Sequence, residues 1–303
     1  MALSLYQIKR WGKMLSGKSP EHVTQGLGKC FSEKTIHGYY NNLTGKVFIE
    51  PHWVESNEIP TVRQNGGADI IFPVAVFQYA LGCYDLYILN GMPKYLSKFL
   101  QLADWTLKSQ DSSGRWCNFL HTDPKNPYGA MAQGEAASVL IRAYMETKDT
   151  NYSDAAKSAI DYMLAPIEKG GTAIYEGDDL LLKEYTHLPV VLNGWIFAWW
   201  GLMDYVTLTQ DTGSYYQKLR QSCDSIVRYL PAFANRYWSR YDLGNKLASP
   251  FYHNLHIAQM QAMYRLTGRS AFNEYALRWK SQANKIPNKS LAFIVKAAQK
   301  ILE

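Results

Sequence analysis

The sequence predicts a mainly α-helical fold, in which helix pairs form an incomplete (α/α) toroid behind a short N-terminal segment containing loops and strands. From Ile70 onward the chain repeats a unit of two helices separated by a polar turn. Repeats of this kind are typical of stacked or ring-like helical architectures. In addition, 47% of the residues are hydrophobic and only 19% are charged, which is enough apolar material for a large core.

Residues 1–69 are predicted to form an N-terminal extension, and residues 70–303 the toroid domain. Within the extension we expect a helix from Met1 to Ser16 and a short strand at Val47 to Ile49, where β-branched and aromatic residues follow each other. Frequent Gly and Pro residues around these elements interrupt any longer helix.

Polar residues mark the starts of four first helices, with separations of 55, 60 and 63 residues: Gln78, Gln133, Asn193 and His256. An amphipathic second helix follows each of them, and these second helices are expected to end near residues 108, 163, 229 and 279. A ring of such pairs places the first helices inside and the second helices outside. A straight stack of helix pairs is the alternative that the periodicity leaves open.

Two long insertions, residues 114–127 and 170–189, are expected to be loops. They contain aromatic residues and few Gly/Ser tracts, and long loops in compact domains are often functional.

The charge and cysteine patterns exclude several classes of protein. The net charge is +6, with no Lys/Arg run of the kind that binds nucleic acid. No apolar stretch is long enough to cross a membrane, and the four cysteines lack the spacing of a zinc site or a disulfide framework. Residues 1–20 lack the apolar core of a signal peptide, so the cytoplasm is the expected location. The sequence is compatible with a homodimer.

The aromatic composition favours a carbohydrate ligand. The chain contains 22 Tyr and 9 Trp against 11 Phe, and the first two types combine a flat apolar face with a polar group, as sugars do. A tyrosine-rich core is the alternative interpretation.

Polar aromatic residues gather in three segments, 126–135, 183–187 and 239–256, each at the start of an inner helix. A ring of inner helices would bring these segments together at one end. Tyr252, His256 and Gln259 follow helical spacing and share one face. His253 and His256 have no third ligand at a recognisable spacing, so we predict no metal site.

The order of these motifs resembles the C-terminal catalytic domain of D-glucuronyl C5-epimerases, which convert glucuronate to iduronate in heparosan-type chains. The similar segments are YGAMAQG at 128–134, EY at 184–185, VLNG at 191–194, YDL at 241–243 and YH at 252–253. Gly244 follows the YDL motif, where eukaryotic members of the family carry arginine.

The resemblance implies an (α/α) toroid with an active-site cleft at one mouth. It also implies that Tyr252 and Glu184 are the acid/base pair, with Tyr128, Tyr185 and Tyr241 as further catalytic residues. The polar side chains beside these motifs are the expected substrate-binding residues: Gln133, Asn193, Arg240, His253, His256 and Lys183.

The residue types fit this chemistry independently. C5 of a uronate lies next to a carboxylate, so its proton is weakly acidic, and inversion needs a base on one face and an acid on the other. No cofactor is required, and the expected partner is an acidic, glucuronate-containing polysaccharide. A polysaccharide lyase and a non-catalytic glycan-binding toroid remain as alternatives. A glycoside hydrolase, for which Glu184 and Asp242 are the only obvious carboxylate pair, ranks below the lyase.

Overall fold

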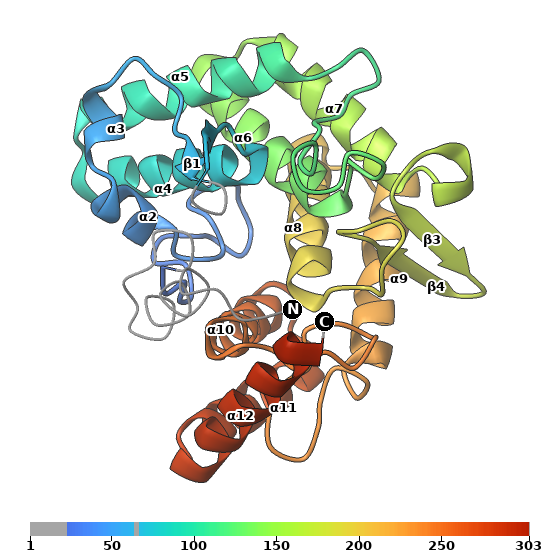
Figure 1. Ribbon diagram of the computed structural model, residues 1–303. Coiled ribbons are helices and arrows are strands. Elements are labelled where there is room, and N and C mark those ends of the chain that lie inside the picture. Colours follow the sequence, from blue (N-terminus) through green and yellow to red (C-terminus); the bar gives the residue numbers. More distant parts are fainter. Residues whose placement is uncertain (1–22, 64–66, 303) are drawn as a thin grey trace.

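A computed structural model describes residues 23–63 and 67–302 of the chain (Figure 1). The described residues are mainly helical. The helix predicted for Met1 to Ser16 lies outside the described residues. Four helix pairs make up the larger part of the molecule: α4 (Pro73–Asn90) with α5 (Pro93–Ser109), α6 (Ala130–Thr147) with α7 (Thr150–Leu164), α8 (Leu192–Thr209) with α9 (Ser214–Tyr229), and α10 (Pro250–Thr267) with α11 (Ser270–Ala283). These are the four pairs that the repeat predicts.

The first helix of each pair is the more deeply buried one. In α6 and in α8, 14 of 18 residues are buried, whereas α9 buries only 5 of 16. Helices that are apolar on nearly every side belong in a core, and helices with one apolar stripe cover it. Figure 1 shows α8 next to α6, with α7 and α9 outside them. Each pair thus has one buried helix, which we call the inner helix, and one covering helix, which we call the outer helix.

Each inner helix ends in the same way. A residue in the left-handed conformation follows its last turn, and the amide of that residue donates to the carbonyl four positions earlier. The four residues are Gly91, Lys148, Gln210 and Gly268. The reversal that follows places each outer helix antiparallel to its partner.

The N-terminal extension contains α2 (Thr44–Ile49), α3 (His52–Glu55) and a two-stranded sheet of β1 (Val62–Arg63) and β2 (Asp69–Ile70). The predicted strand at Val47 to Ile49 is wrong, because these residues form the end of α2. Gly82 of α4 lets α2 approach closely: a methyl group at this position would lie 2.7 Å from the carbonyl oxygen of Leu43 and 3.1 Å from Val47. Packing on α4 thus overrides the local preference for a strand.

The extension shares its core with the helix pairs. Tyr39 and Tyr40 are buried against Trp200 of α8. The Tyr40 hydroxyl donates to Asp204, which also forms a buried ion pair with Arg142 of α6 at 2.6 Å. These contacts attach the extension to the C-terminal halves of α6 and α8. The boundary between the predicted extension and the helical domain stays a prediction.

The second insertion is more ordered than a loop. After the short 3-10 helix η2 (Ile167–Lys169), strands β3 (Ala173–Glu176) and β4 (Asp179–Leu182) form an antiparallel hairpin. Gly177 adopts φ +56 at its turn, a conformation that favours glycine. The hairpin packs on α9 and ends beside α8 (Figure 1). At the other end of the chain, α12 (Ile286–Leu302) follows α11. Within the described residues, no helix has the length and apolarity needed to span a membrane.

Candidate active site

The hairpin delivers Glu184 to the starts of two inner helices. The amide of Lys183 donates to Thr172 at 2.9 Å, and the carbonyl of Lys183 accepts from Ala130, the first residue of α6, at 2.8 Å. Two glycines make room for the next residue: a methyl group at Gly129 would lie 1.9 Å from the Glu184 carbonyl, and one at Gly194 would lie 2.3 Å from its Oε2 atom. Glu184 is therefore wedged between the starts of α6 and α8.

Two further segments join at the same place. The amide of Leu192 donates to the carbonyl of Tyr241 at 3.1 Å, so the loop that carries Tyr241 pairs with the start of α8. Tyr252 lies in the first turn of α10, and its amide donates to the side chain of Ser249, the residue that caps this helix. The rings of Tyr241 and Tyr252 lie 4.8 Å apart at 58°.

Glu184, Tyr185, Tyr241 and Tyr252 form one cluster, which we call the mouth cluster. Tyr185 hydrogen-bonds with Glu184 and with Tyr241, and it interacts electrostatically with Glu184 and with Tyr252. Four of the five residues predicted to be catalytic are thus brought together. The three rings are only partly buried, whereas Glu184 is 7% exposed, so the tyrosines form the accessible side of the cluster.

Burial controls the protonation of the mouth cluster. It raises the pKa of Glu184 to about 7, against a hydrogen bond from Tyr185 that lowers it. Burial also raises the pKa of Tyr185 and of Tyr241, and the negative charge of Glu184 adds to this effect. Near neutral pH the carboxyl can therefore exchange a proton while both phenols stay protonated. This combination suits a general base next to hydrogen-bond donors.

Tyr128 directly precedes Gly129 at the start of α6, but its ring packs against Arg115 and Tyr162. The guanidinium of Arg115 lies 4.1 Å from the centre of the Tyr128 ring, and Tyr162 of α7 packs against that ring at 5.9 Å. Burial raises the pKa of Tyr128 to about 12. Phe119 lies between Tyr128 and the mouth cluster. Its ring stacks on Tyr185 at 4.5 Å, and its amide donates to the carbonyl of Pro127, the residue before Tyr128, at 2.9 Å. Tyr128 thus borders the mouth cluster, and its catalytic role stays a prediction.

Gln133 and Asn193 are buried in the first turns of α6 and α8, deeper in the protein than the tyrosines of the mouth cluster. Gln133 donates to the carbonyl of Gly129 at 3.3 Å, and Gln259 of α10 donates to the carbonyl of Asn193 at 3.2 Å. All three amides are buried, and among the described residues their side-chain oxygens have no hydrogen-bond partner. They are polar groups of the interior.

His253 and His256 were predicted to bind substrate, but the structure places both inside the core with no exposed surface. The Ser239 hydroxyl lies 2.8 Å from Nδ1 of His253 and 3.0 Å from Nδ1 of His256. His253 also stacks on Trp238 at 3.6 Å. Burial lowers the pKa of His253 to about 4 and that of His256 to about 3, so both are neutral. They are core residues at the start of α10, and a role in substrate binding stays a prediction.

The two predicted cations, Lys183 and Arg240, interact with groups outside the mouth cluster. Arg240 donates through Nη1 to the carbonyl of Ala232 at 2.8 Å. Lys183 is mostly buried, which lowers its pKa, and the charge of Glu176 acts against this. Their roles in binding stay predictions. Across residues 23–63 and 67–302 there is no cluster of three His, Cys, Asp or Glu side chains suited to a metal ion.

Sequence reasoning missed one acidic residue near this site. Gly134 allows α6 and α8 to pack closely, since a methyl group there would lie 2.6 Å from Cα of Ala198. The next residue, Glu135, is completely buried, and burial raises its pKa to about 8. A glutamate within a helix otherwise rich in Ala, Met, Val and Leu was the available signal.

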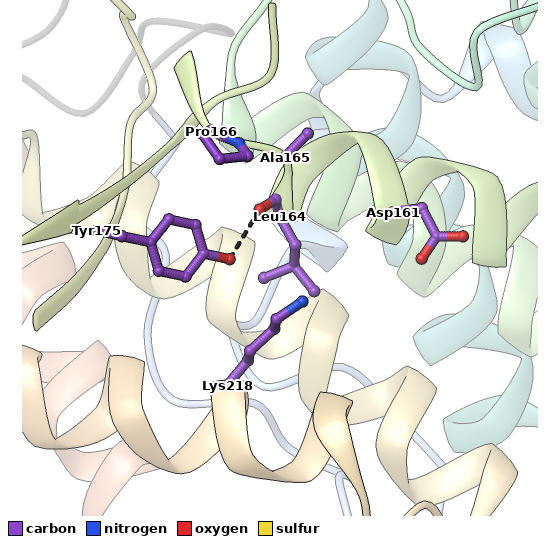
Figure 2. A pocket seen from close by; sticks show the side chains of 6 residues that line it. All are labelled: Asp161, Leu164, Ala165, Pro166, Tyr175 and Lys218. Carbon is purple, nitrogen blue, oxygen red and sulfur yellow. Dashed lines mark hydrogen bonds between the residues drawn. The ribbon is translucent and has the colours of Figure 1, made fainter. Parts of the chain in front are cut away.

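A shallow surface pocket of about 320 Å³ lies elsewhere, between the end of α7, β3 and α9 (Figure 2). Its lining contains none of the predicted site residues: Asp161, Leu164, Ala165, Pro166, Tyr175 and Lys218. The Tyr175 hydroxyl donates to the carbonyl of Leu164 at 2.8 Å (Figure 2), so one of the polar groups in this pocket is already occupied.

The fold and the mouth cluster together define a mainly helical protein with a glutamate and three tyrosines at the starts of its inner helices. Residues 110–281 match the family model described as D-glucuronyl C5-epimerase C-terminus. This match covers more than half of the chain, and the protein belongs to that family. The resemblance of the five sequence motifs is thereby confirmed, and membership supports a carbohydrate-modifying function.

The sequence identity to individual relatives is low. The chain is 31% identical over 158 residues to an uncharacterised protein of Methanocaldococcus jannaschii, covering 50% of this chain and 51% of the relative. It is 24% identical over 209 residues to a D-glucuronyl C5-epimerase of Caenorhabditis elegans, covering 60% of this chain and 34% of that enzyme. A polysaccharide lyase structure superposes with a TM-score of 0.46 at 14% identity, over 82% of this chain and 72% of the lyase. The chain thus spans about half or less of the two curated relatives.

Proposed function

We propose that this protein is a C5-epimerase of uronate residues in an acidic, glucuronate-containing polysaccharide. The observation that carries the proposal is Glu184, a buried carboxyl with a pKa of about 7, beside the three tyrosines Tyr185, Tyr241 and Tyr252. Membership of the C5-epimerase family supports it. We also propose that α4, α6, α8 and α10 are the inner helices of an incomplete (α/α) toroid whose mouth carries this cluster.

The proposed reaction begins with Glu184 as a general base. Its ionised carboxylate removes the C5 proton, and the electron pair of the C–H bond moves into the adjacent carboxylate of the sugar to form an enediolate. Tyr185 and Tyr241 stay protonated, so their hydroxyls donate hydrogen bonds to the enediolate oxygens as negative charge develops there.

Inversion is completed from the opposite face of the ring. Tyr252 donates its phenolic proton to C5, and the electron pair returns from the enediolate to form the new C–H bond. One proton leaves C5 and another arrives, so no oxidant or reductant is needed. Proton exchange between the protein and water then restores ionised Glu184 and protonated Tyr252.

Turnover in deuterated water tests the proposal. Heparosan and other glucuronate-containing polymers are incubated with the protein, and C5 is followed by NMR while ultraviolet absorbance reports unsaturated uronate. We expect inverted C5 centres carrying deuterium, with no rise in absorbance. Rising absorbance would show that the C4 substituent leaves and that the protein is a lyase. Binding of the polymer without hydrogen exchange would indicate a glycan-binding protein.

Glu184→Gln gives the matching control. The amide keeps the shape of the side chain but cannot accept a proton at neutral pH. It should abolish both inversion and C5 proton exchange of glucuronate, whereas Tyr252 can still exchange the C5 proton of iduronate, which lies on its own face. Full inversion by Glu184→Gln would remove Glu184 from the proton path.

A further inference from the structure

Glu135 is a buried carboxyl with an incomplete set of partners. Its side chain on α6 has no exposed surface, and Gln78 of α4 donates to its Oε1 atom at 2.9 Å. The second oxygen, Oε2, is buried and has no hydrogen-bond partner among the described residues. An ionised carboxylate is poorly stabilised in such surroundings, so the site favours a protonated Glu135.

Glu135 lies further along α6 than the helix start that contacts Glu184. Helices α6 and α8 run side by side in the same direction: Gly129 and Gly194 at their starts both contact Glu184, and Gly134 faces Ala198 one turn further on. Glu135 comes six residues after Gly129, so at 1.5 Å per residue it lies ~9 Å along the α6 axis from the start that contacts Glu184. The charge of Glu184 acts on it over this separation.

The charged groups around Glu135 come from several elements. Lys46 of α2 and Tyr39 of the N-terminal extension act on it electrostatically, in addition to Glu184. Helix α4 contributes the neutral Gln78. Residues 192–203 of α8 contain no titratable side chain. Glu184 is the acidic group whose charge raises the pKa of Glu135.

We propose that Glu135 is a positioning residue for the reaction at Glu184, because its own charge state decides whether an anionic sugar can bind beside that carboxylate. With Glu135 protonated, Glu184 alone carries negative charge at the mouth. When Glu135 also ionises, two buried carboxylates and the carboxylate of the substrate repel one another. This inference rests on the function proposed above.

The electrostatic coupling of the two carboxyls agrees with this role. Burial raises the pKa of Glu184 to about 7 and that of Glu135 to about 8. For Glu135, the hydrogen bond from Gln78 and the charge of Lys46 act against this rise, and the charge of Glu184 adds to it. An ionised Glu184 therefore favours the protonated form of Glu135.

The pH dependence of kcat/KM tests the proposal. Wild-type protein should show a rise through pH about 7 and a fall through pH about 8. Glu135→Gln keeps a neutral side chain that can accept from Gln78, so its kcat/KM profile should lose the alkaline fall. At one pH unit above 8, the wild type should have lost about tenfold and the variant less than about twofold. Glu146→Gln is the control, because Glu146 lies at the far end of α6 and accepts from Tyr84. Identical profiles for the wild type and Glu135→Gln would overturn the proposal.

Infrared titration of protein labelled with ¹³C-glutamate reads the two carboxyls without any substrate. The wild type should show two glutamates that ionise near neutral pH. In Glu184→Gln only Glu135 remains, and it should ionise at lower pH than in the wild type because the charge of Glu184 is gone. This measurement also serves if Glu135→Gln does not fold. A Glu135 signal at the same pH in both proteins would overturn the proposal. Coupling without turnover of any uronate polymer would instead overturn the proposed function and, with it, the catalytic role of the pair.

Discussion

The carboxylate of Glu184 lies directly against Gly194, in the first turn of α8. A methyl group at position 194 would lie 2.3 Å from Oε2, 2.7 Å from Cβ and 3.0 Å from Cδ of Glu184. No real contact of this kind is that short, so any side chain at this position must displace the glutamate. The glycine of the VLNG motif therefore leaves the space that the Glu184 side chain occupies.

Gly194→Ala should therefore inactivate the protein while leaving the fold intact. Alanine favours a helix over glycine by roughly 1 kcal/mol, so α8 itself should tolerate the change, whereas Glu184 must move out of register with the tyrosines. We expect kcat to fall by about 10²-fold or more, with an unchanged circular dichroism spectrum. Gly213→Ala is the control, since its methyl group would meet only Asp211 at 3.4 Å. Normal turnover by Gly194→Ala would show that the position of Glu184 does not matter.

Tyr252→Phe removes one hydroxyl from the mouth cluster and keeps the ring that packs on Tyr241. If Tyr252 returns the proton to C5, kcat should fall by roughly 10²- to 10⁴-fold, with little change in the melting temperature. Tyr264→Phe, a change on the exposed side of the same helix, should be neutral. A turnover number within about twofold of the wild type for Tyr252→Phe would assign the proton donor to another residue.

The stability of the protein should fall as the pH rises from about 6.5 to about 8. Burial raises the folded-state pKa of Glu184 and Asp85 to about 7 and that of Glu135 to about 8. In this interval the folded state holds more protons than the unfolded chain, so raising the pH favours unfolding. Between pH about 4.5 and 6.5 the effect is largely offset, because His253 and His256 have lowered pKa values and act with the opposite sign.

Thermal unfolding at fixed ionic strength checks this trend. The melting temperature should be lower at pH 8 than at pH 6.5. The double variant Glu135→Gln, Glu184→Gln should show a smaller decrease, because two of the three carboxyls no longer titrate. A melting temperature that rises over this interval would contradict the raised pKa values.

Ser239→Ala should destabilise the protein and weaken catalysis together. Its hydroxyl lies between Nδ1 of His253 and Nδ1 of His256, and the residue is completely buried. Losing the hydroxyl leaves two buried ring nitrogens with fewer partners, which should cost about 1–3 kcal/mol of unfolding free energy. Because Ser239 precedes the loop that carries Tyr241, the spacing of Tyr241 and Tyr252 should change as well. Denaturant unfolding measures the first effect and kcat the second. Ser153→Ala, at an exposed position, is the control for both.

Several features of the fold could be predicted because they depend on residues close together in the chain. The four helix pairs follow from hydrophobic periodicity, and their ends at Gly91 and Gly268 follow from the preference of glycine for positive φ. The strand predicted at Val47 to Ile49 was wrong because packing of α2 on α4 is not encoded locally. The hairpin of β3 and β4 was missed, although the EGDD segment at 176–179 is typical of a tight turn.

The sequence by itself determined the types of side chain available, the helices that carry them and the end of each helix at which they lie. Only the tertiary structure decided which of them meet. Hydrogen bonds from Ala130 to Lys183 and from Leu192 to Tyr241 join segments about 50 residues apart, and these contacts place Glu184 beside the tyrosines. Contacts with Ser239 and Trp238 hold His253 in the core instead. The physical reason is that the role of an ionisable group depends on its burial and on the charges around it, and both are set by distant parts of the chain.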